Sequence, residues 1–198
     1  MSFQTIFEAQ QSMTVNNRRM VGQQVARSGY ITVAQYLTAV PWVFTVVPHN
    51  YMYYPQVRAI IQSIDNKDRE LPETITFDSA NLSWFLEMQG TATAATLNGT
   101  PTPNTQTLNL TSNGTFKAGD FIMVDGYTYK VTADSAGSVV TIHRPLIGTP
   151  TSGTTVYMGT DCTFTVVAEK CPTYTLTPMT DGAFVNWDDA FVFREYIT

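Results

Sequence analysis

The chain has 198 residues, of which 43% are hydrophobic and 12% aromatic, so it can bury a core and form one or two domains. Only 14% of the residues are charged, against roughly 25% in ordinary soluble domains. The net charge of −5, with a single small basic spot at residues 18–27, excludes specific nucleic-acid binding, which needs a basic stripe. A surface so poor in charge indicates either a simple β-rich protein or one covered by other subunits.

Residues 1–27 are predicted to form an N-terminal arm. They are rich in Gln, Asn and Ser, and their apolar residues are scattered. Phe3, Ile6 and Phe7 fit one face of a helix, but so short a helix needs a partner to pack on. The arm either docks on a neighbouring subunit or is a frayed terminus.

Strand patterns begin at Ser28. A first strand is expected around residues 30–33, and a second at residues 41–47, where Trp42, Phe44 and Val46 alternate and should line one face of a sheet. A helix is expected near 55–66, because a proline at its start is followed by an apolar stripe with the spacing i, i+3, i+4, i+7 (Val57, Ile60, Ile61 and Ile64).

A change of composition marks the next boundary. Residues 91–115 are dominated by Thr, Asn, Gly, Ala and Pro. Beyond them, Asp125-Gly126 separates two strand patterns, which is the strongest short signal for a β-hairpin. We therefore expect an inserted domain at residues 93–160.

Residues 161–198 return to the strand pattern of the first part of the chain. The predicted fold is mainly β: a split β-barrel or sandwich, formed by residues 28–92 and 161–198, with one covering helix and an inserted small β-barrel domain at residues 93–160.

No arrangement of catalytic or metal-binding residues is visible in the sequence. Asp188 and Asp189 are adjacent but read as turn residues, and His49 and His143 are far apart in the chain, with no nucleophile motif near either. We therefore predict no enzyme activity, no catalytic, cofactor-binding or metal-binding residues, and no cofactor.

The two cysteines, Cys162 and Cys171, flank a predicted strand that would hold them apart, which favours free thiols over a disulfide. An alternative function is carbohydrate binding, since Tyr51, Tyr53, Tyr54 and Trp84 could form an aromatic platform. The same residues could instead belong to a core or an interface.

The N-terminus shows no signal-peptide pattern, and no apolar run is long enough to cross a bilayer. We expect synthesis in a cytoplasm and no membrane insertion.

Four segments resemble tail proteins of tailed phages: residues 18–49, with a W-x-F-x-V strand; residues 53–77, with the helix; residues 115–147; and residues 184–197. In residues 115–147 the specific features are the opening KAGDFI and the later Y-x-V-T-A-D, which are similar to a small module recurrent in phage structural proteins. No receptor-binding or peptidase motif of such proteins is matched.

The resemblance implies a structural subunit of a baseplate, tail tip or tube-proximal ring, similar to distal-tail or tube-initiator proteins. Its implied partners are further copies of itself, commonly six in a ring, together with adjacent tail-tube, baseplate or hub proteins, and its implied location is the virion tail. The alternative is an exterior module that binds host-surface glycans.

Overall fold

The computed structural model describes residues 2–18, 21–35, 40–49, 52–112, 114–135 and 138–198. These residues form a mainly β protein with two α-helices, which confirms the predicted fold class. The chain divides into two compact units. The first contains residues 1–16, 41–85 and 163–198, and the second contains residues 17–40 and 86–162.

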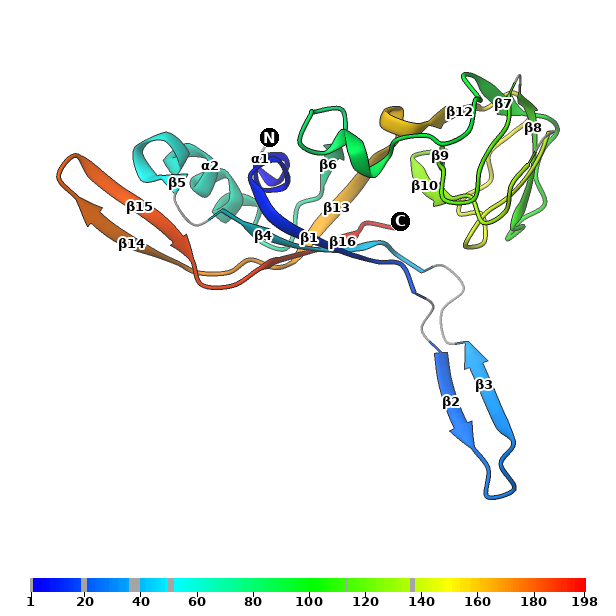
Figure 1. Ribbon diagram of the computed structural model, residues 1–198, viewed down its shortest axis with the longest axis horizontal. Helices are drawn as coiled ribbons and strands as arrows, with labels where there is room; N and C mark the ends of the chain where they lie inside the picture. Colours follow the sequence, from blue (N-terminus) through cyan, green and yellow to red (C-terminus); the bar gives the residue numbers. More distant parts are fainter. Residues whose placement is uncertain (1, 19–20, 36–39, 50–51, 113, 136–137) are drawn as a thin grey trace. The chain divides into compact units, whose positions relative to one another are not determined.

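The first unit is built on a five-stranded antiparallel sheet (Figure 1). Its strands, in spatial order, are β1 (Gln10–Asn16), β4 (Val43–Pro48), β16 (Phe191–Glu195), β13 (Thr163–Lys170) and β6 (Glu73–Thr76). Burial alternates along β4, β13 and β16, so each presents one apolar face, and Phe44, Phe164 and Phe193 are fully or almost fully buried there. The strand predicted around Trp42, Phe44 and Val46 is confirmed, and all three side chains are buried.

Helix α1 (Phe3–Glu8) covers the aromatic face of this sheet. Phe3 and Phe7 are fully buried, and the Phe7 ring lies 5.0 Å from the Phe193 ring and 5.6 Å from the Phe44 ring. The predicted arm is therefore wrong for residues 2–16, because these residues form α1 and edge strand β1. The apolar face of this short helix packs on the sheet, which stabilises the helix.

The predicted helix near 55–66 is confirmed as α2 (Tyr54–Lys67), with Pro55 in its first turn. Ile61 and Ile64 are buried, whereas Val57 and Ile60 are half-buried. The helix packs beside a three-stranded sheet whose strand order is β14 (Tyr174–Met179), β15 (Gly182–Trp187) and β5 (Met52–Tyr53). The first unit thus has two helices rather than the single covering helix expected.

The strand expected around residues 30–33 forms β3 (Ile31–Gln35), which pairs with β2 (Val21–Val25) in a separate two-stranded hairpin. It does not join the sheet of the first unit, to which the sequence analysis assigned it. The hairpin lies between β1 and β4 in the sequence, and those two strands are direct neighbours in the five-stranded sheet. The chain therefore leaves that sheet and returns to the adjacent strand.

Residues 86–162 contain a curled six-stranded sheet, in agreement with the predicted inserted β domain. Its strand order is β10 (Tyr127–Lys130), β9 (Phe121–Val124), β12 (Thr155–Met158), β7 (Ala95–Leu97), β8 (Thr107–Ser112) and β11 (Val139–Thr141). A β-bridge between Val131 and Ile142 joins the two outer strands, so the sheet curls back on itself around an apolar core. The Asp125-Gly126 turn has positive φ at both residues, 53° and 80°, as this hairpin requires.

The boundaries of the units differ from those expected. The second unit begins at Leu86 and ends at Cys162 instead of covering 93–160, and it also includes residues 17–40. The Thr-rich stretch at 91–115, whose composition indicated a boundary, contains β7 and β8. Their alternating threonines and leucines put Leu97, Leu108 and Leu110 into the core. Two short 3₁₀ helices, Ser83–Phe85 and Gly159–Asp161, lie close to the boundaries.

Candidate functional site

The hairpin of β2 and β3 exposes large apolar side chains to solvent. Val25 is 67% exposed, Tyr30 77%, Ile31 63% and Val33 57%. We call these four residues the hairpin surface. The β9–β10 hairpin contrasts with it, because all four residues of β9 are buried. A two-stranded ribbon without a core is marginal in water, so the hairpin surface is a candidate for covering by another chain.

The charges of the chain are distributed unevenly. Residues 17–40 hold three arginines (Arg18, Arg19 and Arg27) and no Asp or Glu, although Arg19 lies outside the described residues. The first unit holds eleven acidic residues against five Lys and Arg. The hairpin segment and the first unit therefore carry opposite net charges.

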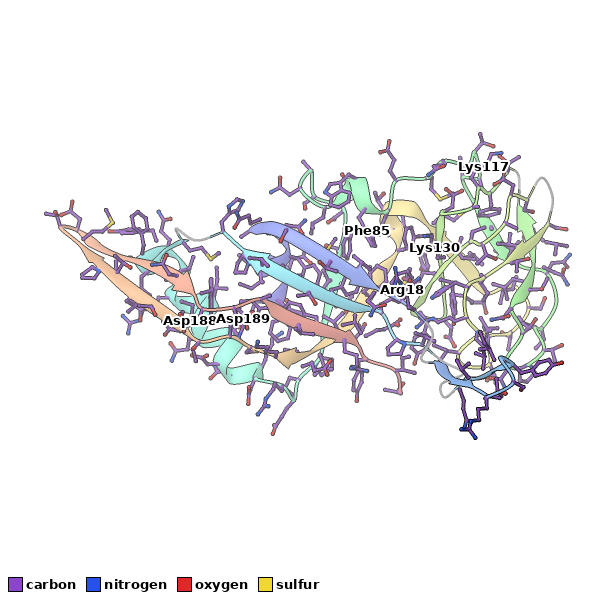
Figure 2. The ribbon with its side chains drawn as sticks, turned by 60° about the horizontal axis from the view of Figure 1, so that its bottom comes forward. Arg18, Phe85, Lys117, Lys130, Asp188 and Asp189 are labelled. Atoms are coloured by element: carbon purple, nitrogen blue, oxygen red, sulfur yellow. The ribbon has the colours of Figure 1, made fainter. Side chains whose placement is uncertain are left out.

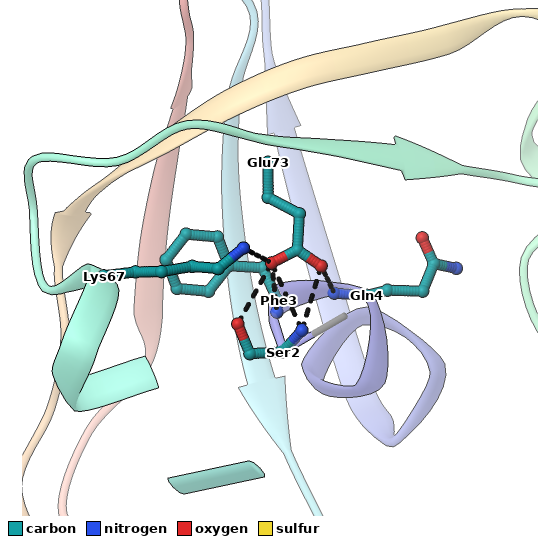
Figure 3. Close-up of polar contacts among 5 residues, drawn as sticks. All are labelled: Ser2, Phe3, Gln4, Lys67 and Glu73. Atoms are coloured by element: carbon teal, nitrogen blue, oxygen red, sulfur yellow. Dashed lines mark hydrogen bonds and ion pairs between the residues drawn. The ribbon is translucent and has the colours of Figure 1, made fainter. Parts of the chain in front are cut away.

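A buried carboxylate anchors the N-terminal helix (Figure 3). Glu73, at the start of β6, accepts hydrogen bonds from the backbone N–H groups of Ser2 (2.9 Å), Phe3 (3.2 Å) and Gln4 (3.4 Å). The Lys67 ammonium group lies 2.5 Å from the same carboxylate. Glu73 thus satisfies N–H groups that a helix leaves unpaired at its start.

The protonation of Glu73 follows from this surrounding. Burial by itself would raise the pKa of the carboxyl group, but the hydrogen bond from Lys67 and those from Phe3 and Ser2 outweigh it. The pKa falls from 4.5 to about 2. At neutral pH the carboxylate is therefore charged, with both oxygens hydrogen-bonded. The sequence offered one signal for this role, namely a charged residue two positions before the buried Ile75 on the inward face of an alternating strand.

Two further buried polar residues organise the second unit. Asp120 is fully buried and accepts hydrogen bonds from the backbone N–H groups of Gln89 (2.7 Å), Gly90 (3.1 Å) and Lys117 (2.7 Å). Arg144 is 1% exposed, and it donates to the carbonyl oxygens of Val40 (2.7 Å) and Thr128 (3.0 Å).

The Arg144 contact shows how segment 17–40 belongs to the second unit. Val40 lies at the end of the stretch that returns from the hairpin, and the buried guanidinium group holds its carbonyl oxygen. The Arg144 guanidinium carbon also lies 5.1 Å from the centre of the Tyr129 ring, a cation–π arrangement. Sequence reasoning did not identify this role, because a single arginine after a strand gives no local signal of burial.

A groove of about 520 Å³ runs beside edge strand β1 in the first unit. Its lining includes Trp84, Glu8, Gln10, Ser12, Asn81 and His49. We call it the Trp84 groove. Strand β1 has β4 as its strand partner in the part of the chain that the structure describes, and this leaves the groove side of β1 as a sheet edge.

The indole of Trp84 is held in place, yet it is 58% exposed. Its N–H group donates to the carbonyl oxygen of Asn81 at 2.8 Å, and its ring meets the edge of Phe85 at a centroid distance of 6.1 Å and an interplanar angle of 78°. Among the described residues, no donor reaches the side-chain oxygen Oε1 of Gln10, although that atom is buried. The groove therefore combines a fixed aromatic ring with an unused hydrogen-bond acceptor.

The aromatic residues grouped in the sequence analysis are not brought together as one platform. The Tyr53 hydroxyl group donates to the carbonyl oxygen of Asp181, and its ring lies 6.4 Å from Phe184 in the three-stranded sheet. Trp84 lines its own groove, and Tyr51 lies outside the described residues.

The acidic pair and the histidines have separate structural contacts. Asp188 and Asp189 lie in the exposed connection between β15 and β16 (Figure 2). Asp188 accepts hydrogen bonds from the Thr173 and Thr175 hydroxyl groups, and Asp189 pairs with Lys170. Their different partners are consistent with turn residues rather than a shared acid pair.

The histidines belong to different units. His49 lies at the end of β4 in the first unit and borders the Trp84 groove. His143 belongs to the second unit, where its Nδ1 accepts a hydrogen bond from the backbone N–H group of Lys130 at 3.0 Å. Within the described ranges, no group of three or more His, Cys, Asp or Glu side chains is placed to hold a metal ion.

The two thiols are free and lie beyond opposite ends of β13, as expected. Burial raises the pKa of both, that of Cys171 to about 11, and negative charge adds to the effect through Asp161 at Cys162 and Asp68 at Cys171. Both thiols are therefore protonated at neutral pH and weak nucleophiles.

Of the helices that the structure describes, none is both long and apolar enough to cross a membrane. A scan against protein-family models finds no match, and no curated protein is significantly similar to this sequence.

Proposed function

We propose that this protein is a structural subunit of a phage tail, in the baseplate, the tail tip or a ring near the tail tube, and that it assembles with further copies of itself. The hairpin surface carries this proposal. Its four apolar side chains are more than half exposed, on a separate two-stranded ribbon. The resemblance of the sequence to tail proteins supplies the biological setting.

The energetics favour covering the hairpin by a protein. Burying one large apolar side chain contributes about 1.5 to 3 kcal/mol. Four such side chains could therefore offset much of the cost of association, which is about 4 to 15 kcal/mol. The main-chain groups along the edges of β2 and β3 would add hydrogen bonds if a neighbour extended the ribbon.

Charge complementarity selects a second copy as the occupant. The charged side chains of the hairpin segment are all positive, and the first unit has an excess of acidic residues. A contact between the hairpin of one copy and the first unit of the next uses two different surfaces. A head-to-tail contact of this kind forms a ring when the rotation between neighbouring copies closes, and the family resemblance implies six-fold closure.

Assembly can be tested by measuring the mass distribution of the purified full-length chain over a range of concentrations. We expect one discrete oligomer for the wild type. Replacing Tyr30, Ile31 and Val33 together by Ser should give a monomer with an unchanged thermal melting curve. Val139→Ser is the matched control, because Val139 is also a strand valine, 51% exposed, in the second unit. It should assemble as the wild type does.

Two results would contradict the proposal. One is a wild-type chain that stays monomeric at every concentration, including in a mixture with tail-tube or baseplate proteins. The other is a triple variant that assembles like the wild type. Weaker assembly at high salt is expected as well, because salt screens the attraction between the arginines and the acidic unit.

A further inference from the structure

We infer that the Trp84 groove is a carbohydrate-binding site that takes a neutral sugar residue of a surface glycan. The site belongs to the first unit alone and does not involve the hairpin surface. The inference therefore stands or falls independently of ring assembly. The proposed sugar site differs from the tyrosine-rich platform considered from the sequence, and it consists of residues around Trp84.

The fixed indole supplies the stacking surface. A sugar ring has one face of C–H groups, and these are attracted to the electron-rich face of an aromatic ring. The N–H group of Trp84 is already bound to the carbonyl oxygen of Asn81, and its neighbour Phe85 meets it edge-on. The ring is therefore pre-oriented, and a ligand would not have to bear the cost of ordering it.

Hydrogen-bonding groups surround this ring. The side chain of Gln10 lines the groove, and its Oε1 receives no hydrogen bond from the described residues, so a small rotation of this amide would offer an acceptor to a ligand hydroxyl group. Glu8 holds Gln4 through one carboxylate oxygen, at 3.0 Å, and also borders the groove. The hydroxyl group of Ser12 adds a group that can donate or accept.

The lining favours a sugar over a peptide. A peptide added as a strand to β1 would need apolar pockets for alternate side chains. Apart from Trp84, Met13 is the single large apolar side chain in the lining, and the others are amides, a hydroxyl, a carboxylate and an imidazole. A volume of about 520 Å³ is within the usual range of small-ligand sites.

The charges favour a neutral sugar. Neither lysine nor arginine is found in the lining, and Glu8 contributes a carboxylate. A sialic acid or a phosphorylated sugar would place a negative charge beside that carboxylate without a strong cation to compensate it. Neutral hexoses and N-acetylhexosamines avoid this cost.

The test is saturation-transfer NMR on the full-length chain with three neutral disaccharides, maltose, lactose and chitobiose, and with sialyllactose as the anionic comparison. We expect at least one neutral disaccharide to bind, with a dissociation constant on the order of 1 mM, as its few atoms allow. Trp84→Ala should weaken binding at least tenfold, and Gln10→Leu should weaken it several-fold. Tyr196→Ala is the control, because Tyr196 is 43% exposed and lies outside the groove, so binding should be unchanged.

Trp84→Phe guards against an effect of folding, because it keeps an aromatic face and should retain part of the affinity. Tryptophan fluorescence gives a second readout, and we expect saccharide to change the emission of the wild type but not that of Trp84→Ala. Failure of all three neutral sugars to bind, binding that survives Trp84→Ala, or binding of sialyllactose alone would each overturn the inference. Loss of the oligomer in Trp84→Ala, with no saccharide bound to the wild type, would identify the groove as a protein contact instead.

Discussion

Residues 2–16 and residues 21–35 follow one another in the chain and look alike in sequence, yet they behave differently in the fold. The first stretch forms α1 and β1 and places Phe3 and Phe7 in the aromatic core. The second forms a hairpin that leaves Tyr30 and Ile31 in solvent. The composition of residues 1–27 predicts a single arm, but the structure divides this segment, rich in Gln and Asn, between core and surface.

The difference lies in long-range partners. The first stretch has an aromatic face matched by Phe44 and Phe193, and it has Glu73 to accept its first N–H groups. The described residues of the hairpin show no comparable set of buried contacts, and its large side chains stay exposed. Among the described residues, the contrast is thus one of buried long-range contacts, which composition alone does not reveal.

The largest expected effect contrasts the two stretches directly. Phe7→Ala should lower the free energy of unfolding by about 3 to 5 kcal/mol, because it empties a fully buried site that contacts three other rings. Ile31→Ala should change it by no more than about 0.5 kcal/mol. Urea denaturation of both variants under conditions that keep the chain monomeric measures the two values. Similar losses in the two variants would mean that the hairpin also has a buried partner.

The next effect depends on pH. The pKa of Glu73 is about 2 in the folded chain, below its usual 4.5, so its contribution is complete above pH 4.5 and is lost as the pH falls toward 2. The size of this contribution is about 3 kcal/mol. Glu73→Gln should therefore be less stable than the wild type at pH 7, and the difference should disappear near pH 2.

The control for this prediction is Glu70→Gln, which removes an exposed carboxylate nearby and should leave the profile of the wild type unchanged. Urea titrations at several pH values provide the measurement. If the gap between wild type and Glu73→Gln did not narrow in acid, the carboxylate would not be the group that anchors residues 2–16. The hairpin has no acidic residues, so amide hydrogen exchange within it should not change as Glu73 titrates.

The smallest effect compares two turns. Gly126 and Gly29 both have positive φ, 80° and 84°, where alanine is strained by about 1 kcal/mol. Gly126→Ala should lower global stability by that amount, because its hairpin is part of the core of the second unit. Gly29→Ala has room for a methyl group and should loosen only the hairpin tip. Amide exchange at Ala26, whose N–H group donates to Tyr30, would report this, and an equal global loss in both variants would contradict it.

Much of the local structure could be predicted from the sequence. The helix at Tyr54–Lys67, the strand of Phe44 and Val46 and the hairpin at Asp125-Gly126 each follow from residues close together in the chain. Strands β7 and β8 were missed because threonine, glycine and proline around them resemble a loop. Strand β15 was missed, because Asp181-Gly182 and Asn186-Trp187 at its two ends resemble turns.

The candidate sites were less accessible to sequence reasoning. Trp84 was named in the sequence as a candidate aromatic, but its neighbours in the groove come from the end of α1, from β1, from the end of β4 and from the loop before its own 3₁₀ helix. Arg144 and Asp120 have roles that depend on backbone atoms far away in the sequence. Such groupings have no local signature.

By itself, the sequence determined the type of most elements, the mainly β character and the existence of an inserted domain, because alternation, helical spacing and turn residues act between near neighbours. The tertiary structure alone decided which strands pair, that residues 2–16 enter the core while the hairpin surface stays exposed, and which polar side chains meet at Glu73 and in the Trp84 groove. Those outcomes depend on which distant residues pack against the same buried surface. Such contacts form only when the chain folds, so no short stretch of sequence encodes them.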